Sequence, residues 1–234
     1  MTTMVAVAKA GGSAVVLHDY WRSSASYRIR IALGLKGITY RRLPVDLVAG
    51  EQRDPGYLAL NPQGLVPVLE IDGQVLTQSL SIIEYLDETR PEPPLLPADP
   101  VVRAHIRKLA QAVACEIHPV SNLAVLARVG ALAGAEMRTQ WNRDNIASGL
   151  QAVEKLLDYP GFSGRFCLGD APGLADCTLI PQLYNARRWG VDYGHLPRIS
   201  AVDRACRTVP AFMAAYPDNF DPLRKARDLQ GENQ

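Results

Sequence analysis

The sequence predicts an α+β domain built on a mixed sheet, followed by an all-α domain. Three observations predict this division: a two-residue Asp72-Gly73 turn between apolar runs is a β-hairpin signal, a proline-rich stretch cannot continue a helix, and the apolar residues beyond it recur at helical spacing. The expected divisions are an N-terminal extension (1–13), a first domain (14–90), a linker (91–98), a helical domain (99–225) and a tail (226–234).

The composition sets limits on the class of protein. A chain of 234 residues has room for two compact domains, and 47% hydrophobic with 21% charged residues is enough to bury a core. With 25 basic and 24 acidic side chains the net charge is +1, so no global field attracts nucleic acid or an anionic membrane. No run of about eighteen apolar residues suggests a membrane-spanning helix. We expect a soluble protein.

The cysteines favour a reducing, cytoplasmic compartment. The four of them form neither a close pair nor a metal-ligand spacing, so we expect free thiols and no metal site. Each is interpreted as a buried small side chain: Cys115, Cys167, Cys177 and Cys206. The segment before Ala14 contains no apolar run long enough for a signal peptide.

The first domain is expected to run βαβ and then ββα. An apolar run from Ala14 to Leu17 predicts the first strand, the serines from Ser23 begin a helix that Gly37 ends, and residues 39–45 predict the second strand. Residues 50–60 are expected to be irregular or helical. The hairpin follows, and Ser79 then begins a helix whose acidic residues are expected to face outward: Glu84, Asp87 and Glu88.

The second domain is predicted to contain only helices, over residues 101–126, 136–157, 174–189 and 199–216. One apolar stripe is interpreted as bundle core rather than as a ligand site: Trp141, Ile146, Leu150, Val153 and Leu157. Asp176 resembles the acidic member of a helix-capping box and is given a structural role.

Three motifs, in order along the chain, resemble the zeta class of the cytosolic glutathione transferases, the maleylacetoacetate isomerase family. They are Arg22 to Leu33, Asn61 to Pro67, and Gln78 to Leu86, and the likeness continues through Leu95-Leu96-Pro97 to Asn185-Ala186-Arg187-Arg188. The resemblance covers nearly the whole chain after the extension. It implies a thioredoxin-like first domain, glutathione as cofactor, a cytoplasmic homodimer and a place in the breakdown of tyrosine or other aromatic compounds.

The resemblance implies a glutathione site in the first domain. A cis bond between Val66 and Pro67 would turn the Val66 backbone toward the cysteinyl backbone of glutathione, although a lone X-Pro bond is more often trans. Gln78 and Ser79 lie at a helix start, where N–H groups favour the γ-glutamyl carboxylate, and Ser79 could also be only a cap. Gln52 aligns loosely with another family contact.

Either Ser23 or Ser24 is expected to activate the thiol of glutathione. Both lie where the first strand passes into the first helix, so a hydroxyl and the first N–H groups could stabilise a thiolate. Ala25 stands where the family usually has Cys. This departure excludes dithiol exchange through the motif and counts against side activities that need that thiol.

Cations are expected where the substrate's carboxylates bind. Arg22 adjoins the serines and Arg188 matches a family arginine, so both are candidates for carboxylate recognition, with a solvated surface arginine as the alternative. Arg22 is also counted with Ser23 and Ser24 among the catalytic candidates. The family places glutathione contacts at His118 and Asn122, one helical turn apart; His118 could equally be a core histidine.

The predicted reaction is glutathione-dependent cis-trans isomerisation of maleylacetoacetate to fumarylacetoacetate. Maleylpyruvate is the nearest alternative substrate. The same fold could also serve a conjugating or dehalogenating transferase, or a non-catalytic binding module.

Overall fold

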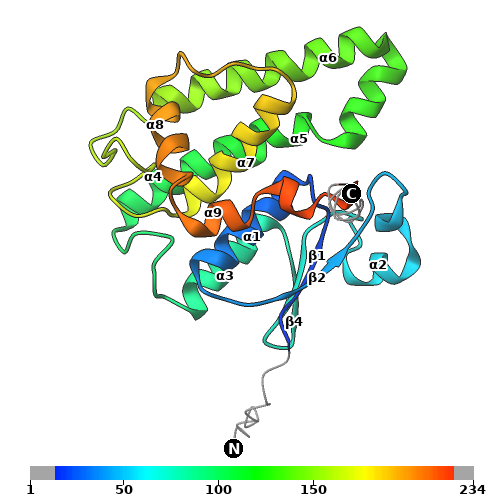
Figure 1. Ribbon diagram of the computed structural model, residues 1–234, viewed down its shortest axis with the longest axis horizontal. Coiled ribbons are helices and arrows are strands. Elements are labelled where there is room, and N and C mark those ends of the chain that lie inside the picture. The colour runs from blue at the N-terminus through cyan, green and yellow to red at the C-terminus, as the bar shows by residue number, and fades with distance from the viewer. Residues whose placement is uncertain (1–13, 224–234) are drawn as a thin grey trace, which may run out of the picture.

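The computed structural model describes residues 14–223, which form a small sheet with helices on both sides and a larger helical layer above it (Figure 1). The expected N-terminal extension and the tail lie outside the described residues. The α+β first domain and the all-α second domain are both confirmed.

The sheet has four short strands in the order β2-β1-β3-β4. Their bounds are β1 Val16–Asp19, β2 Arg41–Pro44, β3 Val68–Ile71 and β4 Gln74–Thr77. β1 pairs parallel with β2 and antiparallel with β3, and β3 pairs antiparallel with β4. The hairpin prediction at Asp72-Gly73 is therefore confirmed, and both turn residues have the positive φ such a turn requires.

Three helices flank the sheet: α1 Ser24–Leu35, α2 Pro55–Leu60 after the 3-10 turn η1 Glu51–Arg53, and α3 Ser79–Thr89. α1 and α3 lie between the sheet and the helical layer, and α2 lies on the other side of the sheet (Figure 1). α1 begins where predicted because the Ser23 hydroxyl accepts the Ser26 N–H at 3.2 Å.

Asp87 holds the linker in place instead of facing solvent as expected. Its carboxylate accepts hydrogen bonds from the N–H groups of Leu95 and Leu96 at 2.7 and 3.1 Å, and from Lys36 Nζ at 2.7 Å. Lys36 also donates to the carbonyls of Arg90 and Pro93, at 2.6 Å each. The prolines give the linker stiffness, and these bonds fix its path.

The helical layer runs from the linker to residue 220. Its elements are α4 Pro100–Gln111, the π-helix η2 Ala112–Ile117, α5 His118–Val120, α6 Leu123–Leu156, α7 Leu174–Arg188, α8 Pro197–Cys206, α9 Pro210–Ala214 and η3 Pro217–Phe220. The helix expected over 101–126 breaks at Asn122, which caps α6 instead. α6 consists of two helical segments joined at Gly134, whose φ of 87° suits glycine, so the helix predicted over 136–157 is present directly after this break.

Two expectations about burial are wrong. Ile146, Leu150, Val153 and Leu157 are buried as predicted, but Trp141 is 39% exposed and its indole N–H donates to the Val120 carbonyl at 3.0 Å. Cys115 is exposed, whereas Cys167, Cys177 and Cys206 are buried. Periodicity identifies a helix face but not how far that face is covered by neighbouring chain.

One stretch of the described chain, Pro100–Leu156, contains a window long and apolar enough to cross a membrane by length and composition alone. The stretch comprises several successive helices with a kink, and 28% of the apolar window is buried. This is weak support for a membrane span.

A buried ion pair fixes the end of β1. Asp19 and Arg30 are both almost fully buried, and Arg30 Nη1 donates to the two Asp19 carboxylate oxygens at 2.6 and 2.8 Å. Arg42 Nε donates to the same carboxylate at 2.5 Å. Arg30 also donates to the carbonyls of Trp21 and Ala215 at 3.0 and 3.1 Å. One side chain therefore joins β1, α1, the loop between them and the C-terminal helices.

We predict that Asp19→Asn lowers the free energy of unfolding by about 3–5 kcal/mol, because it leaves the buried Arg30 charge without its anion. The matched control is Asp72→Asn, which breaks the partly exposed pair with Arg90 and should cost much less. Urea denaturation of the two variants tests this. Equal losses would show that the Asp19 pair does not hold the fold together.

Candidate active site

The topology brings three loops to one edge of the sheet. β1 and β3 are antiparallel with His18 opposite Val68, and β3 and β4 are antiparallel with Val68 opposite Thr77. The end of β1, the start of β3 and the end of β4 therefore meet. The loop at Trp21 to Ser23, the Val66-Pro67 pair and the Gln78-Ser79 pair follow or precede these strand ends directly.

The first of these loops presents a hydroxyl at a helix start. The Ser23 N–H donates to the Tyr20 carbonyl at 2.9 Å, and the Ser23 oxygen accepts from Ser26, which leaves the Ser23 hydroxyl proton available for donation. Ser24 occupies the first position of α1 and its side chain is buried. The half-buried Ser23 is the more accessible of the two serines.

The second loop presents a strip of backbone. The Val66–Pro67 peptide bond is cis, as expected from the resemblance; Glu92–Pro93 is also cis. The Leu65 carbonyl accepts from the Tyr57 hydroxyl at 2.7 Å and from Asn61 Nδ2 at 2.8 Å. These two bonds fix the peptide group that precedes Val66. Among the described residues, no hydrogen bond outside helices and strands uses the Val66 backbone.

The third loop ends at the N-terminus of α3. Gln78 precedes the helix with a φ of 66°, an uncommon value for a residue other than glycine, and its Nε2 donates to Gln63 Oε1 at 2.8 Å. Ser79 is buried, and its hydroxyl oxygen accepts a hydrogen bond from Arg28 Nη1 at 3.0 Å. The hydroxyl proton of Ser79 is thus directed away from Arg28.

Gln52 lies in η1, partly buried, and its Oε1 is enclosed with no partner among the described residues. An enclosed amide oxygen without a donor is uncommon in native structures. This is the one observation that marks Gln52 beyond its alignment with the family.

The two arginines expected to bind carboxylate lie close enough to repel each other. Burial lowers the pKa of Arg188, and the charge of Arg22 lowers it further. Arg22 Nη2 donates to the Tyr20 hydroxyl at 3.1 Å, and its guanidinium lies over the Trp21 ring at 5.1 Å from the centroid. Neither arginine forms an ion pair within residues 14–223. The arrangement suits an anion with two carboxylates.

His118 and Asn122 follow the π-helix, a rare element that often marks functional sites. Burial, with the Arg28 charge as a second cause, lowers the pKa of His118 to about 3, so this ring is neutral at physiological pH. Asn122 caps α6, since its Oδ1 accepts the Val125 N–H at 2.9 Å. The amide N–H groups of Asn122 are the part of this side chain that can serve a ligand.

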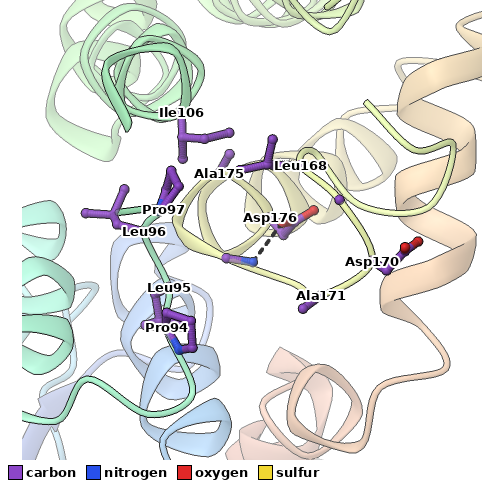
Figure 2. A pocket seen from close by; sticks show the side chains of 12 residues that line it. Pro94, Leu95, Leu96, Pro97, Ile106, Leu168, Asp170, Ala171, Ala175 and Asp176 are labelled. Atoms are coloured by element: carbon purple, nitrogen blue, oxygen red, sulfur yellow. Dashed lines mark hydrogen bonds between the residues drawn. The ribbon is translucent and has the colours of Figure 1, made fainter. Parts of the chain in front are cut away.

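One cavity adjoins this set of residues and another lies apart from it. One, of about 440 Å³, is lined by Tyr20 and Trp21 together with Asp46, Glu51 and Phe220, and so adjoins the Arg22 loop. The other, of about 260 Å³, lies between the linker and the loop before α7 (Figure 2). Apolar linker residues form much of its wall, and the Asp176 carboxylate accepts the Gly173 N–H at 2.9 Å, which confirms its capping role.

Sequence reasoning missed Arg28, which is only 2% exposed. A signal was present: Tyr27, Ile29 and Ile31 surround Arg28 and Arg30, which leaves no polar face for either arginine.

Comparisons with known proteins agree with this geometry. Residues 22–89 match the family described as glutathione S-transferase, N-terminal domain, and residues 124–218 match glutathione S-transferase, C-terminal domain. The maleylacetoacetate isomerase of Rhizobium meliloti (strain 1021) is 56% identical over 209 residues, which is 88% of this chain and 98% of that protein.

Two solved structures are similar along most of their length. One is a holo maleyl pyruvate isomerase, described as a bacterial glutathione S-transferase in the zeta class, with 45% identity, a TM-score of 0.83, and coverage of 86% of this chain and 96% of that one. The other is maleylacetoacetate isomerase from Anaeromyxobacter dehalogenans 2CP-1 with dicarboxyethyl glutathione and citrate bound, at 43% identity, a TM-score of 0.78, and coverage of 89% and 93%. The chain belongs to the glutathione S-transferase family, in its zeta class.

Proposed function

We propose that this protein is an enzyme that uses glutathione to isomerise a cis maleyl dicarboxylate, with maleylacetoacetate converted to fumarylacetoacetate. The observation that carries the proposal is the set of three loops at one sheet edge together with a pair of arginines, Arg22 and Arg188, that form no ion pair within residues 14–223.

The residues present fit glutathione. The Val66 backbone would pair with the cysteinyl backbone, and the start of α3 with Ser79 would hold the γ-glutamyl carboxylate. Gln52 offers a side chain whose enclosed oxygen lacks a donor in the described part of the chain, and His118 and Asn122 offer N–H donors to the glycyl end. Each part of the tripeptide therefore has a group of matching chemistry.

When bound, glutathione supplies a thiolate that adds to the conjugated double bond, permits rotation about the resulting single bond, and leaves again. The protein's part is to stabilise charge. The Ser23 hydroxyl and the first N–H groups of α1 would lower the pKa of the thiol, and Arg22 and Arg188 would hold the two carboxylates while charge moves to the enolate oxygen. Proton transfer from the protein is not required.

The relative from Anaeromyxobacter supports the addition step. A dicarboxyethyl group on glutathione is what remains when a thiol adds across the double bond of a cis-butenedioate, and that enzyme's structure contains this adduct in its active site. The same chemistry is proposed here because Arg22 and Arg188 offer two cations beside the thiol-activating loop.

Maleylpyruvate remains the nearest alternative substrate, since one of the similar solved structures is a maleyl pyruvate isomerase. Conjugation or dehalogenation on the same glutathione site is a second alternative, and Ala25 in place of the family Cys counts against it. A non-catalytic binding module is the third.

The test follows loss of maleyl absorbance for maleylacetoacetate and maleylpyruvate, side by side, with and without glutathione. Glutathione-dependent loss of one in clear preference would establish the reaction and name the substrate. Inactivity on both would refute the proposal and direct attention to chloroacids, aromatic electrophiles or binding alone.

The proposed enzyme is a cytoplasmic homodimer without membrane attachment that acts in the breakdown of aromatic compounds. Light scattering measures the oligomeric state directly.

We predict that Ser23→Ala raises the pKa of the bound glutathione thiol by about one to two units, because a hydrogen bond to a charged group contributes about 1.5–3 kcal/mol. Ser24→Ala is the matched control and should shift it less. Thiolate absorbance against pH measures both. A larger shift in Ser24→Ala would transfer the activating role to Ser24.

We predict that Arg188→Ala reduces kcat/KM for the maleyl substrate by about 10- to 100-fold, mainly through KM, and leaves the glutathione Kd unchanged. Arg187→Ala is the control, since Arg187 pairs instead with Asp203 at 3.3 Å. Steady-state kinetics and calorimetry separate the two effects. Unchanged kinetics would remove Arg188 from the site.

The low pKa of His118 predicts a loss of stability in acid. The folded pKa of about 3 lies below the unfolded value of about 6.5, so the unfolded chain binds more protons between these values. The free energy of unfolding should therefore fall as pH decreases through this window, and it should fall less in His118→Gln than in wild type. Urea denaturation at several pH values tests this, with the exposed His195→Gln as control. Identical slopes for wild type and His118→Gln would contradict it.

A further inference from the structure

Arg28 is a buried cation without a counter-charge in the described part of the chain. Its side chain is 2% exposed, and it forms no ion pair within residues 14–223. Nη1 donates to the Ser79 hydroxyl at 3.0 Å, while Nε and Nη2 are enclosed with no partner among those same residues. Burial lowers the pKa of Arg28 to about 10, so the guanidinium still carries its charge at neutral pH.

The neighbours of Arg28 do not compensate it. The titratable groups that act on it or respond to it are Cys115 and His118, and His118 is neutral in the folded protein. A buried guanidinium without an anion is costly, because the lost hydration is not replaced. Arg30, two residues along the same helix, shows the usual arrangement, with Asp19 as a fully buried partner.

The charge lies directly behind the first turn of α3. Ser79 is the first residue of that eleven-residue helix, whose unpaired N–H groups already favour an anion. Because the Ser79 oxygen accepts from Arg28, the Ser79 proton must point elsewhere, toward whatever binds at the helix start. Hydrogen bonds in such a chain strengthen one another.

We propose that Arg28 is a positioning residue for glutathione, which orients the Ser79 hydroxyl and supplies the positive charge that the γ-glutamyl α-carboxylate neutralises on binding. This inference rests on the proposed function. Arg28 acts through Ser79 and does not itself contact the ligand. The bound carboxylate thereby offsets the free-energy cost of the buried, uncompensated guanidinium. Affinity for the γ-glutamyl end of the tripeptide therefore depends on Arg28, which does not contact the ligand.

The test measures by calorimetry how three ligands bind to wild type and to two variants. The ligands are glutathione and two analogues that lack the γ-glutamyl α-carboxylate. The first analogue, γ-aminobutyryl-cysteinyl-glycine, lacks only this carboxylate. The second, the γ-glutamyl α-carboxamide of glutathione, also retains the amine-bearing stereocentre. The variants are Arg28→Met and Arg28→Gln, which remove the charge with an apolar and a polar side chain. Arg107→Met is the matched control, because Arg107 also bonds to an α3 side chain, Glu84, but in a partly exposed ion pair.

We expect both Arg28 variants to bind glutathione at least about tenfold more weakly than wild type, as for loss of a charged interaction, and to bind the two analogues without the carboxylate with unchanged affinity. Arg107→Met should bind every ligand as wild type does. An equal loss for glutathione and the analogues would show that Arg28 only supports the fold and would overturn the inference.

The experiment also distinguishes failure of the Arg28 variants to fold from failure of the proposed function. If neither Arg28 variant melts cooperatively, Ser79→Ala removes the acceptor of the Arg28 hydrogen bond without touching the buried charge, and the same ligand-selective loss is expected; a loss independent of the carboxylate again overturns the inference. If wild type fails to bind glutathione at all, the proposed function fails first. Wild-type binding with a non-selective loss overturns only the role of Arg28.

Discussion

The buried ion pair between Asp19 and Arg30 is the constraint on which the rest of the structure depends. Asp19 is the last residue of β1, and the loop that follows presents Arg22 and Ser23. Arg30 holds that carboxylate, the Trp21 carbonyl and the Ala215 carbonyl at once. The loop is therefore fixed to α1 on one side and to the C-terminal helices on the other, which is how a hydroxyl and a guanidinium can be held ready before a ligand arrives.

The two buried arginines of α1 show two ways of placing a cation in a protein interior. Arg30 is compensated by Asp19 and by two carbonyls, so its charge is used within the fold. Arg28 has one neutral acceptor among residues 14–223, and its charge remains available to an anion. The same helix thus carries one arginine that stabilises the protein and one whose stabilisation depends on a ligand. Their spacing of two residues directs them to different neighbours, β1 and α3.

The fold was predictable because its signals are local. The Asp72-Gly73 turn, the Ser23 cap and the prolines of the linker act through neighbouring residues, and each confers structure where expected. The wrong expectations about Asp87 and Trp141 concern contacts distant in sequence. Asp87 was assigned to solvent because the sequence does not show its contacts with the linker. Trp141 was assigned to the core from its place in an apolar stripe, but its helix face is only partly covered. The role of Arg28 likewise depends on Ser79, 51 residues away.

In the proposed function both domains contribute to the site. The sheet edge supplies backbone, a helix start and a hydroxyl, all of them groups that suit one tripeptide and would serve any reaction of its thiol. Arg188, which is not part of that edge, comes from the end of α7 and lies near Arg22 because the two domains pack through α1. A change of substrate could therefore occur around Arg188 without disturbing the glutathione contacts proposed for the sheet edge. Discrimination between two maleyl acids must then arise around Arg188 and the loop beside Arg22, where the tail of the substrate would lie, and not in the motifs that reveal the family.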